Sequence, residues 1–232
     1  LNRNIYQDQS LNGTYPLILQ AKSDLGVGIT GEVSLYSRLL WGASLGDYGT
    51  TSGINAHWVH FYRLVDRSNA IIKSAENLDE INPDRRNQIL AEAKAMRAHA
   101  FFTLYRLFNN IYITTEPTTP ENAFDVPQDK SSPDEIFALL RSDLDFAIEH
   151  LDYATEQFGR WGQGAARHLR AKVAMWENDW SEAAAQADAI INSGFHSLVP
   201  TEQVFAGTLE HSESLFTVNF MKETIGGGSA HI

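Results

Sequence analysis

The side chains best suited to chemistry in this sequence of 232 residues are aromatic, and they gather around one glycine-rich stretch. Residues 41–53, WGASLGDYGTTSG, hold two large rings, and a third follows five residues later. Aromatic faces on exposed loops stack against the C–H faces of sugar rings, and neighbouring carboxylate or amide oxygens accept hydrogen bonds from sugar hydroxyls. We therefore predict a ligand-binding site that consists of Trp41, Asp47, Tyr48, Asn55 and Trp58.

Packing is the competing interpretation of every ring. Trp58 lies in an amphipathic segment, where a place in the core of its own helix is the stronger interpretation from sequence alone. For Trp41 and Tyr48, packing within the loop and ligand binding are equally well supported. The remaining tryptophans lie at the ends of predicted helices, where we expect packing in the core: Trp161, Trp176 and Trp180.

The sequence lacks the common catalytic patterns. It contains no Gly-x-Ser-x-Gly elbow, no P-loop, no dinucleotide fingerprint and no His-Glu-x-x-His. With no cysteine, thiolate catalysis and thiolate zinc sites are excluded. His57 and His60 are three residues apart, but no acidic residue follows at ligand spacing, so two half-exposed histidines are the better interpretation. We assign no catalytic residue, no metal ligand and no cofactor, and we expect a protein that is not an enzyme.

Paired-carboxylate catalysis finds no local support either. Asp143 and Asp145 are two residues apart on a predicted helix and cannot both face one site. A pair of acids distant in sequence remains open as an alternative.

Composition narrows the range of partners. The net charge of −11 argues against a surface that binds phosphate groups. No run of five basic residues exists, so nucleic acid and anionic lipid are poor partner choices. The contents of hydrophobic residues, 43%, and charged residues, 20%, are typical of globular chains. No stretch of eighteen apolar residues is present, so we predict no membrane-spanning helix.

The elements that must position these side chains are helices. Apolar and small residues recur every three or four positions over residues 54–78 and 88–108, which predicts two long helices packed as an antiparallel hairpin. The second helix places its apolar residues on one face and Arg97 on another, and its alanines allow a neighbouring helix to approach closely. Asn82 and Pro83 form its start signal, and Asn109 tolerates the left-handed conformation of a C-terminal cap.

A further set of signals predicts the rest of the helical scaffold. Ser132, Pro133 and Glu135 form a capping box and open a helix that continues to residue 151. Residues 160–177 and 180–191 form a helix pair with large and small residues alternating over about 34 residues, which is typical of tetratricopeptide packing. Gly194 can take the left-handed cap that ends this pair.

Irregular segments separate these helices. Residues 110–132 contain three prolines, and we expect them to run extended over the surface. Residues 214–220, SLFTVNF, alternate with a period of two, which predicts a strand or an extended segment. Short helices are expected within residues 17–25 and 32–40.

Four segments taken together resemble one family. Their order in the chain is that of the SusD/RagB family. The segments are HWVHFYRLVDRSNAII, then AEAKAMRAHAFFTLYRLF followed by residues 114–117, then the helix pair GRWGQGAARHLRAKVAMWENDWSEAAAQADAIINSG, and finally SESLFTVNF. The resemblance covers about residues 55–220. It implies a mainly α fold: a SusD-like, tetratricopeptide-like helical-repeat scaffold with long irregular loops and little strand.

The resemblance also implies a function and a domain organisation. SusD/RagB proteins bind glycans or other nutrients without catalysis and deliver them to a SusC-like TonB-dependent outer-membrane barrel. They lie on the extracellular face of the outer membrane, attached through a lipidated cysteine that this chain lacks. We expect residues 1–232 to be a single SusD-like helical domain and the N-terminal part of a longer protein. Its helical repeats would span about 54–194, and residues 195–232 would be extended and begin the ligand-binding half.

The sequence departs from the family pattern at one turn. Asn109, Asn110 and Tyr112 stand where the family commonly has Gly, Asp and Pro. This difference changes the turn and leaves the helix intact. The main alternative function is a helical-repeat scaffold that binds proteins and no sugar, and a hydrolase is a distant third.

Overall fold

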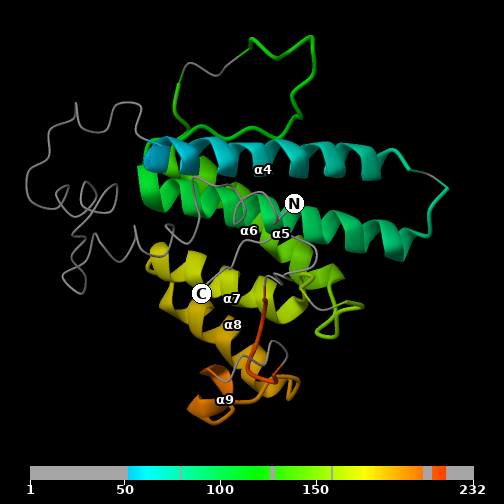
Figure 1. Cartoon of the computed structure of the whole chain (residues 1–232), viewed down its shortest axis with the longest axis vertical. Coiled ribbons are helices and arrows are strands. Elements are labelled where there is room, and N and C mark those ends of the chain that lie inside the picture. Colours follow the sequence, from blue (N-terminus) through cyan, green and yellow to red (C-terminus); the bar gives the residue numbers. More distant parts are fainter. Residues whose placement is uncertain (1–51, 79, 126–128, 158, 206–210, 218–232) are drawn as a thin grey trace, which may run out of the picture. The chain divides into compact units, whose positions relative to one another are not determined.

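The structure is a computed structural model that describes residues 52–78, 80–125, 129–157, 159–205 and 211–217. These residues form helices and connecting segments, and no strand occurs among them. The predicted helical fold class is therefore confirmed. The helices are α4 (Ser52–Glu76), α5 (Pro83–Phe108), α6 (Pro133–His150), α7 (Gln163–Trp176), α8 (Trp180–Asn192) and α9 (Thr201–Phe205) (Figure 1).

The chain divides into two compact units. Leu1–Arg63 with Phe220–Ile232 form one, and Leu64–Asn219 form the other, so α4 runs through the boundary. Of the first unit, the structure describes the first half of α4. The short helices expected within residues 17–25 and 32–40, and most of the loop 41–53, lie outside the described residues. Ser52 and Gly53 begin α4, so the helix starts two residues earlier than predicted.

Helix α5 is the central element of the second unit. The side chain of Asn82 accepts hydrogen bonds from the backbone N–H of Asp84 and Arg85, and Pro83 takes the first helical position, as predicted. Asn109 ends the helix at φ 59°, the expected left-handed cap. The expectation of one buried face is wrong. Side chains on nearly every side of the helix are buried, because helices α4, α6 and α7 surround it: Leu90, Ala91, Ala93, Ala95, Arg97, Ala98, Ala100, Phe101, Phe102, Thr103 and Leu104.

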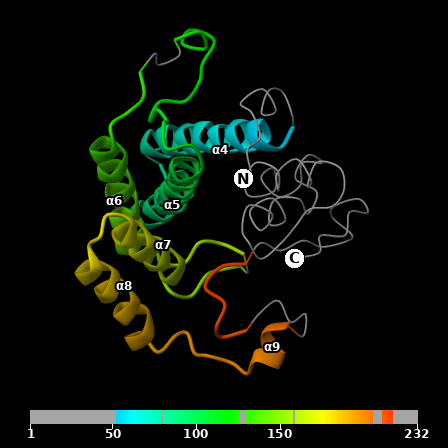
Figure 2. The same ribbon diagram turned by 90° about the vertical axis from the view of Figure 1, so that its left-hand side faces the viewer.

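Helices α4 and α5 run antiparallel, side by side, as predicted (Figures 1 and 2). Ile72 and Ala75 of α4 form an apolar cluster with Leu90 and Ala93 of α5. Ala75 and Ala93 contribute the small side chains of this cluster.

Helices α6, α7 and α8 follow as a layered series, each packed on the one before it. The capping box of α6 is present: Glu135 N–H donates to Ser132 Oγ, and Ser132 N–H donates to the Glu135 carboxylate. Asn178 takes φ 62° in the tight turn between α7 and α8, and Asp179 caps α8 by accepting from Glu182 N–H. The predicted helix pair is confirmed.

Two tryptophans beside this turn are not core residues. The side chain of Trp176 is 49% exposed and that of Trp180 is 61% exposed, so the prediction that they pack in the core is wrong. Trp180 belongs to α8, which has no buried residue, and Trp176 lies at the end of α7 with its ring edge-on to that of Phe102, 6.0 Å away. Trp161, by contrast, is buried as expected, and its ring lies 5.0 Å from that of Phe216.

The segment after α8 turns back toward the start of α7. Gly194 takes φ +67°, as predicted for a residue in a left-handed cap. Ser197 N–H then donates to Ser212 O at 3.1 Å, which joins the two ends of the segment 197–212 that contains α9. Of the two forms predicted for residues 214–220, a strand or an extended segment, the strand is excluded for residues 214–217, which have no regular secondary structure; residues 218–220 lie outside the described part of the chain. A single pair of segments with few mutual backbone hydrogen bonds does not make a ladder.

No helix among the described residues is long and apolar enough to cross a membrane.

Candidate functional site

The structure describes two of the five predicted ligand-binding residues. Trp41, Asp47 and Tyr48 lie outside the described residues. Asn55 and Trp58 lie in the first half of α4. The site therefore stays a prediction, and α4 is the element that carries its described part.

Trp58 forms an aromatic pair with Tyr62, one helical turn further along α4. The two ring centroids lie 4.7 Å apart with an angle of 47° between the planes. Both side chains are partly exposed, so they lie at the edge of the core. A ring held by a neighbour and still accessible on one side is suited to stacking on an apolar ring face.

Two histidines near this pair differ from expectation. His57 and His60 are 4% and 7% exposed, so the prediction of two half-exposed histidines is wrong. They share one helical face with Phe61 and Leu64, at steps of three and four residues. The pattern of apolar residues does not predict that this whole face is buried, because His57, His60 and Ser68 on it are polar.

A buried ion pair joins α5 to α6. Arg97 is 4% exposed and binds Asp143 in a bidentate manner, with Nε to Oδ2 and Nη2 to Oδ1 both 2.8 Å. Lys94 Nζ lies 3.7 Å from the same carboxylate. The sequence placed Arg97 on an outer face of its helix, and that placement is wrong. Two fixed parallel hydrogen bonds satisfy charges that would otherwise be costly to bury.

Asn69 extends this network from α5 to the segment that follows it. The side chain of Asn69 is fully buried; its Oδ1 accepts from Arg97 Nη1 at 2.8 Å. Its Nδ2 donates to Thr114 O at 3.0 Å and to Glu116 O at 3.2 Å. We call residues 113–118 the strap. One amide thus connects the buried ion pair to the backbone of an otherwise irregular segment.

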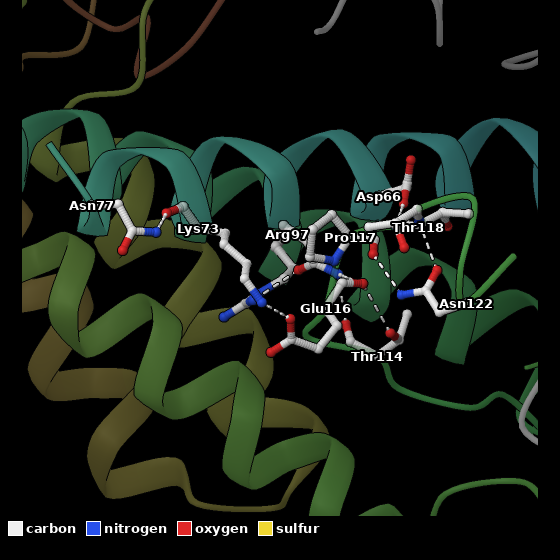
Figure 3. Close-up of polar contacts among 11 residues, drawn as sticks. Asp66, Lys73, Asn77, Arg97, Thr114, Glu116, Pro117, Thr118 and Asn122 are labelled. Atoms are coloured by element: carbon white, nitrogen blue, oxygen red, sulfur yellow. Dashed lines mark hydrogen bonds and ion pairs between the residues drawn. The ribbon is translucent and has the colours of Figure 1, made fainter.

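The strap lies along α4 and is held there at two further points (Figure 3). Lys73 forms an exposed ion pair with Glu116. Thr118 N–H donates to Asp66 Oδ1 at 2.6 Å. Further back, Ser131 N–H donates to Ile111 O at 2.9 Å, which closes the base of the loop that contains the strap. The sequence predicts that residues 110–132 run extended over the surface. Their described part has no helix or strand and is mostly exposed or partly exposed, but residues 120–124 form turns and Ile111 is buried.

A shallow polar cleft lies between the start of α5 and the segment after α6. Its volume is about 30 Å³, and its lining includes Trp161. Two ion pairs lie on its walls, Arg85 with Glu156 at 3.1 Å and Arg160 with Glu92 at 2.6 Å, and Asp152 is a further charged residue of the lining. A space of this volume holds one or two water molecules, so it is too small to enclose a sugar ring.

His99 has a strongly lowered pKa. Burial, together with the nearby charges of Arg106 and Lys172, lowers the pKa of His99 from 6.5 to about 4. Its ring lies 6.1 Å from that of Trp161. The imidazole is therefore neutral at pH 7, and its side chain is largely enclosed but keeps some exposure to solvent. Among the described residues, no group of three or more His, Asp or Glu side chains could hold a metal ion.

The polar network was missed in the sequence, although one signal for it exists. Asp143 falls in the apolar stripe of its helix with Ile136, Leu140 and Ala147, three and four residues apart. An acid in such a stripe needs a buried cation. The partner, Arg97, lies 46 residues away, so local spacing could not identify it.

Comparison with known proteins agrees with this fold. A SusD-like family model, described as "Starch-binding associating with outer membrane", matches residues 8–175. The chain belongs to the SusD-like family. One SusD-like protein of Formosa agariphila is 29% identical over 73% of this chain and 32% of its own length. Another from the same organism is 24% identical over 94% of this chain and 46% of its own.

Solved SusD-like structures share the fold. A laminarin-binding SusD-like protein has a TM-score of 0.75 at 21% identity, with 91% of this chain and 46% of that chain covered. A structure with a xylogluco-oligosaccharide has a TM-score of 0.71 at 20% identity, with 92% and 43% covered. The predicted SusD-like, tetratricopeptide-like scaffold is thus confirmed, and the chain spans less than half the length of these SusD-like relatives. The family is associated with the outer membrane, and its members are known as glycan-binding proteins and not as enzymes.

Proposed function

We propose that this chain is the helical part of a non-catalytic glycan-binding protein on the outer-membrane surface. Membership of the SusD-like family, over residues 8–175, is the observation that carries the proposal. The partly exposed rings of Trp58 and Tyr62 support it, because an accessible aromatic face is what a sugar ring requires.

The finer parts of the proposal concern delivery and attachment. A SusC-like TonB-dependent barrel would receive the bound oligosaccharide. The protein would be attached to the extracellular face through a lipidated cysteine that this chain does not contain. The ligand would contact Trp41, Asp47, Tyr48, Asn55 and Trp58.

A glycan array tests the binding function. Each oligosaccharide that binds is then incubated with the protein, and chromatography shows whether the protein has cleaved it. We expect binding of at least one oligosaccharide and recovery of that oligosaccharide unchanged. An array without any bound glycan would contradict carbohydrate binding, and a shortened product would contradict the non-catalytic role.

A protein-binding scaffold without a sugar ligand is the second candidate. The observation that favours it is the exposed apolar surface of α8, where Trp180 is 61% and Ile191 is 70% exposed. Apolar side chains of this size on one helix are typical of surfaces that contact other proteins. Recovery of the barrel in a pull-down, combined with no heat of binding for any oligosaccharide, would favour this candidate over the first.

A further inference from the structure

Helix α8 has an apolar side that is exposed to solvent. Trp180, Ala184, Ala187 and Ile191 recur at steps of four, three and four residues, so they lie on one side of the helix. All four residues are exposed, and the exposed fraction is 61% for Trp180 and 70% for Ile191. We call these four residues the outer stripe.

A different side of α8 faces α7. Gln186 Oε1 accepts from Arg167 Nη1 at 2.8 Å, and Glu182 forms an ion pair with Arg170 at 3.2 Å. At about 100° per residue, Glu182 and Gln186 lie roughly 150° around the helix axis from the outer stripe. Figure 2 shows α7 between α8 and α5. The outer stripe therefore points away from the helix on which α8 packs.

Exposed apolar side chains are concentrated in this part of the chain. Among the described residues, six of the nine exposed large hydrophobic side chains lie within residues 175–198: Met175, Trp176, Trp180, Ile191, Phe195 and Leu198. Single exposed apolar side chains are common on protein surfaces, whereas a concentration of them marks a surface that contacts other polypeptide. Both ends of the outer stripe belong to this group.

The outer stripe is unlike the outer side of a terminal repeat. In tetratricopeptide-like arrays each repeat packs on its neighbours, and the terminal repeat presents a polar face to solvent. The outer stripe instead has large apolar side chains at its ends, two alanines between them and no charge. Another helix can approach closely over the alanines while its apolar side chains contact Trp180 and Ile191. The occupant that fits this side of α8 is an amphipathic helix.

The order of the helices indicates where in the sequence this helix lies. Helices α6, α7 and α8 pack in chain order, each on the one before it, so the next layer is expected after α8. The described residues after α8 include α9, which has five residues and leaves the outer stripe exposed. The solved relatives are long enough to contain a further layer, since the match covers 46% of the laminarin-binding protein and 43% of the structure with a xylogluco-oligosaccharide.

We propose that the outer stripe of α8 is an internal docking surface, covered in the full-length protein by an amphipathic helix from the polypeptide that follows residue 232. This inference rests on the proposed function, in which the chain is one part of a longer protein. It assigns the exposed side of α8 to contacts within one polypeptide.

The test is the reactivity of single cysteines introduced into α8 of the full-length protein. Ala184→Cys lies in the outer stripe. Ala185→Cys is the matched control, because both alanines are exposed and the second lies about 100° further around the helix. We expect a maleimide to modify Ala184→Cys at least tenfold more slowly than Ala185→Cys, as measured by mass spectrometry of the α8 peptide. Ile191→Cys introduces no extra bulk into the covered surface and should be protected to a similar extent.

Three outcomes would overturn the inference. Equal rates at the two alanine positions would show that the outer stripe is open in the full-length protein, and the surface would then be available to another protein. A gene that encodes no residue after 232 would remove the proposed occupant. A dimer in sedimentation, with protection of Ala184→Cys that is lost on dilution, would assign the outer stripe to a second copy of the chain. Failure of the proposed function is a separate result, because labelling reports packing and the glycan array reports binding.

Discussion

At the scale of single residues, one buried polar network determines how α4, α5 and α6 fit together. Arg97 binds Asp143 through two hydrogen bonds and Asn69 through a third, all at 2.8 Å. Such a network specifies one arrangement of helices, since any other leaves a charge without its partner. Its removal should therefore destabilise the protein far more than the loss of an exposed pair.

Arg97→Met should lower the free energy of unfolding by about 3–5 kcal/mol, because Asp143 is left buried and charged without its bidentate partner. Adding Asp143→Leu should recover part of the loss, since the unpaired charge is then gone. Urea unfolding measures both variants. Lys73→Ala is the control; it removes an exposed ion pair with Glu116 and should cost less than about 1 kcal/mol. Equal losses for Arg97→Met and Lys73→Ala would contradict the account.

His99 should make stability depend on pH between about 4 and 6.5. The pKa of His99 is lowered in the folded state, so in this range the unfolded chain binds a proton that the folded protein does not. Stability should consequently fall as pH falls from 6.5 to about 4, by up to about 3 kcal/mol. His99→Gln should lose stability less steeply over the same range of pH.

The unfolding free energy at pH 7 and at pH 4.5 measures this difference. His168→Gln is the comparison: the pKa of His168 is lowered by partial burial of its ring and by the nearby Lys172, but the residue as a whole is exposed, so its substitution should change the pH slope less than His99→Gln does. A wild type and a His99→Gln variant with the same pH slope would show that His99 accepts its proton equally in both states.

At the scale of elements, the helices could be predicted from sequence because their signals are local. Asn82 and Pro83 start α5, the Ser132 capping box starts α6, and Gly194 follows α8. Each signal acts within four residues of the helix end. For residues 214–217 the sequence left a strand and an extended segment open, because a strand needs a partner and alternation cannot show whether one is present; the structure has no strand there.

Burial was harder to predict than helix position. The sequence predicts an exposed Arg97, but the side chain is buried. It predicts Trp180 in the core, but that side chain is 61% exposed. The burial of each side chain depends on the residues that pack against it. The partner of Arg97 is Asp143, 46 residues away in sequence, and no residue of α8 is buried. For the same reason the strap could be predicted as irregular, while its attachment to Asn69 could not.

Asn69→Leu should release the strap from α4. The substitution removes the donor to Thr114 O and Glu116 O and the acceptor for Arg97, at a cost of about 2 kcal/mol or more. Hydrogen exchange should show faster exchange at Thr118 N–H and its neighbours. Asn77→Ala is the control, because Asn77 bonds only its own helix at Lys73 O and should leave the strap unchanged. Unaltered exchange in Asn69→Leu would mean that the strap is held by other contacts.

Two tryptophans should respond differently to truncation. Trp161 is 6% exposed, so Trp161→Ala should cost about 3–5 kcal/mol through the cavity it leaves. Trp180→Ser should change stability by less than about 0.5–1 kcal/mol, since most of that ring already faces solvent. Thermal unfolding of the two variants compares them. A large loss for Trp180→Ser would restore the sequence-based expectation that it is a core residue.

At the scale of the whole molecule, family membership and local chemistry reside in different places. The segments that carry the family resemblance lie mainly in α4, α5 and the α7–α8 pair, and the family model matches residues 8–175. The predicted ligand residues lie within residues 41–58, before α5 to α8 in the sequence, and the described part of the loop between α5 and α6 lies on the far side of α4 from α7 and α8 (Figure 2). A scaffold of this kind can keep its helices while its loops change ligand.

The central claim is that the aromatic residues at positions 41–58 bind a glycan. Calorimetric titration with an oligosaccharide found on the array tests it most directly. The wild type is compared with the double variant Trp41→Ala and Tyr48→Ala. Trp180→Ser is the control, because that tryptophan lies outside the predicted site. Loss of two stacking rings should weaken binding about tenfold or more, at about 1 kcal/mol or more for each ring, while Trp180→Ser should bind as the wild type does. Undiminished binding by the double variant would contradict the claim.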